Sequence, residues 1–241
     1  MGTFLFIVFI VLLVYIFSRS RKNNNEINSG RISTTDHRID HTNNTYKNDI
    51  SNFLAERNIT TLFHFTRLSN LNSIMEHGLY PRNKINSICQ NVIINDQYRI
   101  DKRINTSSLS ISFPNSKMFY KYRMLQKDTQ WIVLGLDAAI LYEKNCLFCF
   151  TNAASKAITS LSNEDLKGIE ALKKLFIRHN DIEYDLPVNF PTDIQAEVLV
   201  QDIIEPKYIK FIHTDDKLIA DEGIKFDKTY FDSRDYYLKN H

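Results

Sequence analysis

Glu197 has the setting of a catalytic carboxylate. It follows the turn-forming residues 191–195 and precedes the apolar run Val198–Val200, so it begins a strand that is otherwise suited to burial. A charge at the mouth of a buried strand costs free energy unless another group pairs with it or a reaction uses it. A lone glutamate at such a place also fits a solvated edge residue, so its neighbours decide between the two interpretations.

Two polar side chains lie near the end of another predicted strand, Thr61–Thr66. They are His64 and Thr66, and a helix is predicted directly after them over residues 70–77, with Gly78 as its stop. Residues at strand ends and turns are well placed to bind ligands. A histidine in a strand also fits a purely structural role.

Hydroxyl groups and bases gather in the segments that follow. Within residues 108–113, serines alternate strictly with apolar residues, which predicts a strand with one core face and one hydroxyl face. The irregular segment 81–105 precedes it and suits ligand contacts, with bases at Arg99, Lys102 and Arg103. The segment Lys117–Arg123 interleaves bases with aromatic rings. That pattern is typical of phosphate and ring binding, and equally of an amphipathic helix with exposed lysines.

Length and composition restrict the function further. The 241 residues allow one ample domain with extensions, and further strands are predicted over 131–136 and 208–213. The net charge of +2, from 30 basic and 28 acidic residues, gives no global field for nucleic acid, so any such contact needs a local patch. No P-loop, dinucleotide-binding glycine fingerprint, zinc-ligand set or nucleophile elbow is present. Cys146 and Cys149 lie in an apolar phrase and are interpreted as reduced and buried.

The chain begins with a hydrophobic segment. Residues 4–17 are apolar or aromatic without interruption, and Arg19, Arg21 and Lys22 follow them. This pattern predicts an uncleaved anchor over residues 1–18 in the inner membrane, with the following domain on the cytoplasmic side. The alternative is a hydrophobic helix that docks on a partner or on the domain. We expect an Asn-rich tether over residues 19–46, the catalytic domain over 47–213 and a mixed-charge tail, weakly ordered or peripherally docked, over 214–241.

The polar groups named above suit the breaking of a charged glycosidic bond. An arginine would hold a pyrophosphate, aromatic rings would enclose a flat leaving group, and a glutamate would stabilise an oxocarbenium-like ribose. Four phrases lie in order along the chain: His64-Phe65-Thr66 with Asn70-Leu71, Ser73-Ile74 and Gly78-Leu79; Ser110-Ile111-Ser112-Phe113-Pro114-Asn115 with Met118-Phe119-Tyr120; Thr151-Asn152-Ala153-Ala154; and Gln195-Ala196-Glu197-Val198-Leu199-Val200. Together, over residues 60–213, they resemble the DarT family of DNA ADP-ribosyltransferase toxins.

The resemblance implies an α+β fold and a reaction. The fold would be an ADP-ribosyltransferase-like split, twisted β core with flanking helices, here preceded by a single hydrophobic helix. NAD would bind in its cleft, without a metal, and ADP-ribose would pass to a base of single-stranded DNA with release of nicotinamide. The resemblance leaves thymine and guanine open as the target base. It also implies an antitoxin partner of the NADAR or macrodomain type that reverses the modification.

The resemblance also assigns roles to residues. Glu197 matches the family's catalytic glutamate, and Arg103 matches its catalytic and NAD-contacting arginine, with Arg99 as the rival. The other residues expected to bind NAD are His64, Phe65, Thr66 and Ser73, with Tyr120 stacked on the nicotinamide. Two alternatives remain: a related transferase that modifies RNA or protein, and a membrane-tethered nucleic-acid-binding module with a degenerate NAD pocket.

Overall fold

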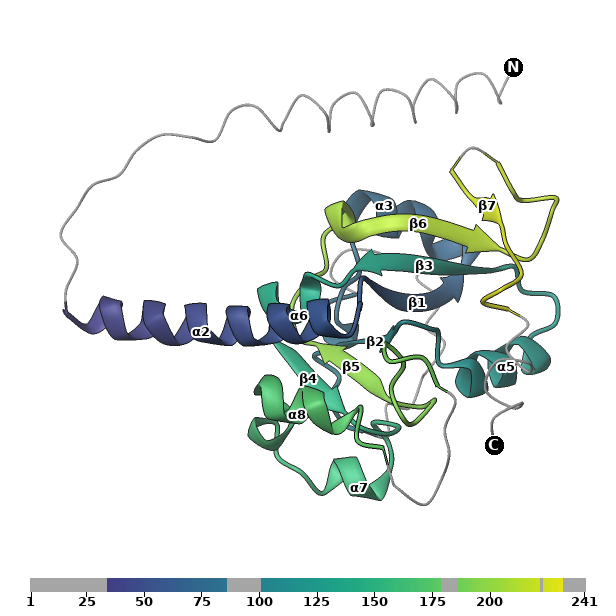
Figure 1. The fold of residues 1–241 in the computed structure, drawn as a ribbon. Coiled ribbons are helices and arrows are strands. Elements are labelled where there is room, and N and C mark those ends of the chain that lie inside the picture. The colour runs from purple at the N-terminus through teal and green to yellow at the C-terminus, as the bar shows by residue number, and fades with distance from the viewer. Residues whose placement is uncertain (1–33, 86–100, 179–185, 222, 232–241) are drawn as a thin grey trace, which may run out of the picture. The chain divides into compact units, whose positions relative to one another are not determined.

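The computed structural model describes residues 34–85, 101–178, 186–221 and 223–231 (Figure 1). Two compact units are distinguished, residues 1–41 and residues 42–241. The first contributes to the described chain only the beginning of helix α2 (Thr34–Glu56). The second contains all the described strands.

A seven-stranded sheet organises this unit, with its strands in the order β4-β5-β2-β1-β3-β6-β7. All neighbouring strands are antiparallel except β6 and β7, which are parallel. The strands are β1 (Thr61–Arg67), β2 (Ser107–Ile111), β3 (Trp131–Asp137), β4 (Cys146–Cys149), β5 (Glu197–Val200), β6 (Ile209–Thr214) and β7 (Lys225–Phe226). The largely antiparallel sheet with helices around it confirms the predicted α+β class.

The sheet divides between β1 and β2. These strands pair only at Leu62 with Ile111 and at Phe63 with Ser110. In contrast, β1 pairs with β3 along its whole length, and β2 pairs with β5 over residues 107–109. Beyond Phe63 the two strands therefore separate, which confirms the predicted split core. The separation frees groups on both strands to line a cavity.

Apolar side chains pack on both faces of the sheet, because successive residues of a strand point to opposite faces. The main core joins Leu62 and its neighbours to α2 through Ile50, Phe53 and Leu54. Across the sheet, Phe63 packs against Phe119 of α5 (Ser116–Leu125). A third cluster joins β4 and β5 to helix α7 (Lys156–Thr159): Leu147, Cys149, Leu199 and Ile158. The sheet is thus held on both sides near its division.

Short helices connect the strands. They are α3 (Leu71–His77), α4 (Arg82–Ile85), α6 (Ile140–Glu143) and α8 (Gly168–Lys174), with 3-10 turns at Leu68–Asn70, Glu164–Leu166 and Pro206–Tyr208. Gly78 ends α3 as predicted, with φ of +92°. A Cβ atom there would lie 2.3 Å from the Ile204 carbonyl oxygen, so only glycine lets Leu79 bridge to Ile204.

The structure differs from the expected organisation near the N-terminus. A tether was expected through residue 46, whereas α2 begins at Thr34. Residues of this helix from Ile50 onward pack in the core, and no proline or glycine interrupts the sequence between Gly30 and Glu56, so nothing in the sequence breaks the helix before Thr34. The predicted anchor lies outside the described residues. Among the helices that are described, none is long and apolar enough to cross a membrane.

Part of the expected C-terminal tail packs against the sheet. β7 pairs with β6, and Phe231 is buried in the cluster that holds Phe63 and Phe119. Arg123 of α5 fixes this segment, because its guanidinium donates to the Phe231 carbonyl oxygen at 2.6 Å and pairs with Asp215 at 2.5 Å. The last ten residues of the tail lie outside the described part.

Candidate active site

A cavity of about 250 Å³ opens where β1 and β2 separate. Its walls come from both strands, from α3 and the residues after it, from α5 and from the loop that follows β4. Five of the predicted site residues line it: His64, Phe65, Thr66, Ser73 and Glu197. The fold therefore gathers most of the residues that the resemblance assigns to NAD and to catalysis, and their roles stay predictions.

Glu197 is half-buried at the first position of β5 and is held by three N–H groups. Its Oε1 accepts from Asn115 Nδ2 at 3.3 Å and from Asn152 Nδ2 at 3.5 Å, while its Oε2 accepts from the Ala153 backbone N–H at 3.4 Å. Donors of this kind favour the ionised form of a carboxyl group. The solvated-edge interpretation of Glu197 is therefore wrong, because the side chain faces a cavity with donors fixed around it.

His64 bridges the gap between the separating strands. Its Nδ1 lies 2.9 Å from the Ser108 carbonyl oxygen, and a carbonyl only accepts, so Nδ1 carries the proton. Burial lowers the pKa of His64, and this hydrogen bond acts in the opposite direction. The ring is therefore neutral near pH 7, and its Nε2 presents a lone pair that accepts hydrogen bonds.

Hydroxyl groups line the wall beside His64. Ser108 and Ser110 of the predicted hydroxyl face line the cavity, whereas the backbone turns at Ser112, where φ is +62°. Thr66 accepts from Asn70 Nδ2 at 3.1 Å, so its own proton is available to donate. Ser107 Oγ is buried, and no partner for it lies within the described chain. The wall offers both donors and acceptors to a polyhydroxylated ligand.

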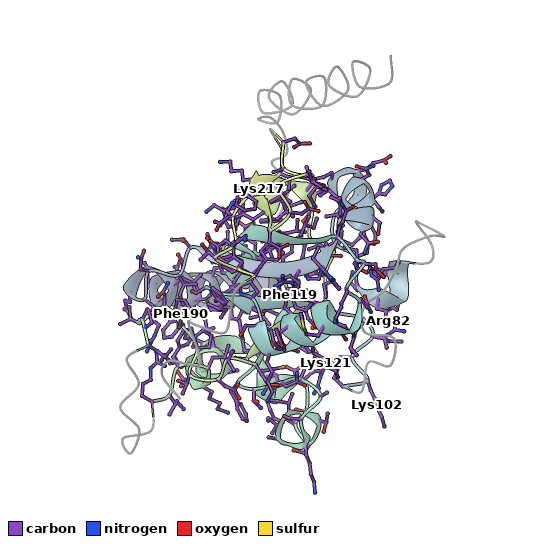
Figure 2. All side chains as sticks on the ribbon, turned by 90° about the vertical axis from the view of Figure 1, so that its right-hand side faces the viewer. Arg82, Lys102, Phe119, Lys121, Phe190 and Lys217 are labelled. Carbon is purple, nitrogen blue, oxygen red and sulfur yellow. The ribbon has the colours of Figure 1, made fainter. Side chains whose placement is uncertain are left out.

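The aromatic side chain of α5 that reaches the cavity is Tyr122, with Met118 one turn before it. Tyr120, which was expected to stack on nicotinamide, does not line the cavity and is 36% exposed. Figure 2 looks onto α5 and shows Phe119 toward the sheet and Lys121 away from it. Residues 118 and 122 share a helix face and residue 120 does not, so helical periodicity identifies Tyr122 once Met118 is known to line the cavity.

The two arginines expected to contact NAD, Arg103 and Arg99, are not found in the described cavity wall, whereas a third arginine is. Arg103 does not line the cavity: its Nε donates to Asn163 Oδ1 at 3.0 Å, and its Nη2 to the Leu161 carbonyl oxygen at 3.0 Å. Arg99 lies outside the described residues. Arg82, at the start of α4, does line the cavity and is labelled in Figure 2. Its sequence context carries no motif, and only the fold identifies it.

Two further groups bear on the chemistry. Cys146 and Cys149 are buried without a disulfide, as interpreted from the sequence, and burial raises the pKa of the Cys146 thiol far above its usual range. Among the described residues, no group of three or more His, Cys, Asp or Glu side chains is placed to hold a metal ion. The described polar groups of the cavity are thus amides, hydroxyls, one imidazole, one guanidinium and the carboxylates of Asp101 and Glu197.

Comparison of the sequence with known protein families identifies the family to which this chain is similar. Residues 63–228 match the family model described as ssDNA thymidine ADP-ribosyltransferase, DarT. No curated protein matches the chain. The matched range contains the cavity-lining parts of β1, β2, α5 and β5, together with Glu197.

Solved structures of this family are similar at low identity. Thermosipho africanus DarTG in complex with ADP-ribose is 20% identical, over 71% of this chain and 50% of that chain, with a TM-score of 0.48. This chain therefore spans half the length of that protein. Thermus sp. 2.9 DarT in complex with ADP-ribosylated ssDNA is 13% identical, over 72% and 96% of the two chains, with a TM-score of 0.47. Because the family model matches well over half of the sequence, the chain belongs to the DarT family, as its four phrases predict.

Proposed function

We propose that this chain transfers ADP-ribose from NAD to a base of single-stranded DNA and releases nicotinamide. The observation that carries the proposal is the position of Glu197, which shares one cavity with His64 and Thr66 while three N–H donors hold its carboxylate. Family membership supports the same reaction. The activity is that of a toxin within a toxin–antitoxin or phage-defence pair.

In the proposed reaction, Glu197 acts on the ribose next to nicotinamide. The bond between the ribose C1′ and the nicotinamide nitrogen breaks, and neutral nicotinamide leaves with the electron pair. Positive charge develops on the ribose, and the Glu197 carboxylate stabilises it and orients the incoming base. A ring nitrogen of the base then forms a bond to C1′, and its proton passes to solvent water.

The remaining cavity residues bind NAD. The Nε2 lone pair of His64 accepts from a ribose hydroxyl or an amide, and the Thr66 hydroxyl donates. Tyr122 and Phe65, whose ring centroids lie 6.2 Å apart, supply flat apolar surface for a nicotinamide or adenine ring. Among the described residues of the cavity wall, Arg82 carries a guanidinium group, which suits binding of the NAD pyrophosphate. Lys102 and Lys121 are exposed on the face shown in Figure 2 and suit the DNA backbone.

The test is the mass of the modified nucleic acid. The purified chain is incubated with NAD and each homopolymeric DNA oligonucleotide, and mass spectrometry detects an added ADP-ribose unit. We expect the thymidine oligonucleotide to gain it, since the description of the family model names thymidine. The guanosine oligonucleotide tests guanine as the alternative target base. Glu197→Gln should lower the rate by about 100- to 1,000-fold. Normal transfer by that variant would contradict the assignment of Glu197.

The alternatives give different outcomes in the same assay. Transfer to RNA oligonucleotides or to lysate proteins, with none to DNA, would favour a related transferase. Salt-dependent binding of single-stranded DNA without release of nicotinamide would favour a binding module with a degenerate pocket.

Two partners complete the proposal. We propose an antitoxin of the NADAR or macrodomain type that removes ADP-ribose, and its co-expression should restore growth of cells that express this chain.

We also propose that residues 4–17 attach the chain to the inner membrane with the catalytic unit on the cytoplasmic side, on the strength of the apolar run and the bases after it. Fractionation checks this: the full chain should sediment with membranes, and a chain without residues 1–18 should not.

A further inference from the structure

Two asparagines converge on the Glu197 carboxylate from segments far apart in the sequence. Asn115 lies between β2 and α5, and Asn152 lies in the loop after β4. Both donate from Nδ2 to the same oxygen, Glu197 Oε1, at 3.3 Å and 3.5 Å. Both also line the cavity.

The orientation of each amide is fixed by its other end. Asn115 Oδ1 accepts from the Met118 backbone N–H at 3.1 Å and thereby caps α5, and Asn152 Oδ1 accepts from the Ala154 backbone N–H at 2.9 Å. An amide carries its acceptor and its donors on opposite branches. Flipping either side chain would break this bond to the backbone, so each NH2 group is directed to Glu197.

The backbone of Asn115 is fixed as well. The chain turns at Ser112, where the φ of +62° is unusual for a residue other than glycine, and Ser112 Oγ donates to the Asn189 carbonyl oxygen at 2.6 Å. The Asn115 N–H then donates to Ser110 Oγ at 3.1 Å, and the residue is only 3% exposed. The helix cap therefore fixes the position of the Asn115 side chain, which in turn donates to the Glu197 carboxylate.

We infer that Asn115 and Asn152 are positioning residues that hold the Glu197 carboxylate toward the ribose. The inference rests on the function proposed for Glu197. Neither asparagine needs to touch the reacting atoms: each limits the rotamers of a half-buried side chain, whose other oxygen accepts from the Ala153 N–H. Misorientation of a catalytic group lowers turnover more than it lowers binding.

Isosteric substitution tests this inference. Asn115→Asp and Asn152→Asp keep the oxygen that accepts from the backbone, and aspartate is as good a helix cap as asparagine. Each replaces the NH2 group beside Glu197 with an oxygen, so a donor becomes a second negative charge. The matched control is Asn145→Asp, because Asn145 also donates its amide to a carboxylate, Asp202 at 3.0 Å, but does not line the cavity.

The first readout does not depend on activity. Carboxyl-carbon NMR follows the titration of Glu197 in each protein. The other ionisable groups of the described cavity wall are those of His64, Tyr80, Arg82, Asp101 and Tyr122. We expect the Glu197 midpoint to rise in both site variants relative to wild type and to stay unchanged in Asn145→Asp. Equal midpoints in all four proteins would overturn the inference, whether or not the chain modifies DNA.

The second readout is the kinetics of transfer. Both site variants should lose up to about 100-fold in kcat with little change in KM for NAD, and the acidic limb of their pH–rate profiles should move to higher pH. Asn115→Ser, which keeps a helix cap and removes the donor without adding a charge, should lose kcat with a smaller shift of the limb than Asn115→Asp. If wild type is active and the site variants match the control, positioning is refuted; if wild type transfers nothing to DNA while the midpoints move, only the proposed substrate fails.

Discussion

Replacing Arg103 by alanine separates two roles that the sequence and the structure assign to it. Its sequence position matches a residue that contacts NAD, whereas its guanidinium donates to Asn163 Oδ1, to the Leu161 carbonyl oxygen and, at 3.5 Å, to the Ile158 carbonyl oxygen. These bonds tie the segment before β2 to the segment after α7. We predict that Arg103→Ala lowers stability and weakens NAD binding only indirectly.

The magnitude follows from those bonds. Hydrogen bonds contribute about 0.5–1.5 kcal/mol each, and the two at 3.0 Å in a half-exposed setting give about 2 kcal/mol in total. For a domain of this size, about 1 kcal/mol shifts the midpoint of thermal unfolding by about 2–4 °C, so the expected fall is about 4–8 °C.

The assay pairs thermal unfolding by circular dichroism with NAD titration by calorimetry. Arg82→Ala is the comparison variant, since Arg82 lines the cavity. A lost charge-assisted bond to phosphate costs about 1.5–3 kcal/mol, so its Kd for NAD should rise about 10- to 100-fold, more than that of Arg103→Ala. An Arg103→Ala protein with an unchanged unfolding midpoint and no NAD binding would refute this reasoning and restore the role predicted from the sequence.

Two further predictions concern the cavity wall. Burial lowers the pKa of His64 below its ordinary value of 6.5, so as pH falls the unfolded chain takes up the proton before the folded chain does. The stability that the neutral His64 contributes is therefore complete above about pH 6.5 and is lost as pH falls below it. Urea unfolding at about pH 7.5 and about pH 5.5 should therefore show a smaller loss for His64→Gln than for wild type. His213→Gln controls for the other histidine whose pKa burial lowers, and an equal loss in wild type and His64→Gln would contradict the prediction. Tyr122→Ala should weaken NAD binding about tenfold, as expected for one aromatic contact, whereas Tyr120→Ala should not; calorimetry that ranks them in the opposite order would refute the assignment of Tyr122.

Much of the architecture could be predicted from the sequence, because the signals were local. Strict alternation identified the hydroxyl-bearing strand, a continuous apolar run identified β3, and Gly78 marked the end of α3. The four ordered phrases identified the family and put Glu197 at the start of its strand. Such patterns depend on backbone period and turn chemistry, which a few neighbouring residues specify.

Only the tertiary structure decided what surrounds the Glu197 carboxylate. Asn115 and Asn152 reach Glu197 because β2 and β4 flank β5 in the sheet, and neither asparagine carries a local signal of that role. The same holds for Arg82, which reaches the cavity, and Arg103, which bonds to the segment after α7. The physical reason is that the direction of a loop side chain depends on contacts with segments distant in sequence, whereas a strand's period does not.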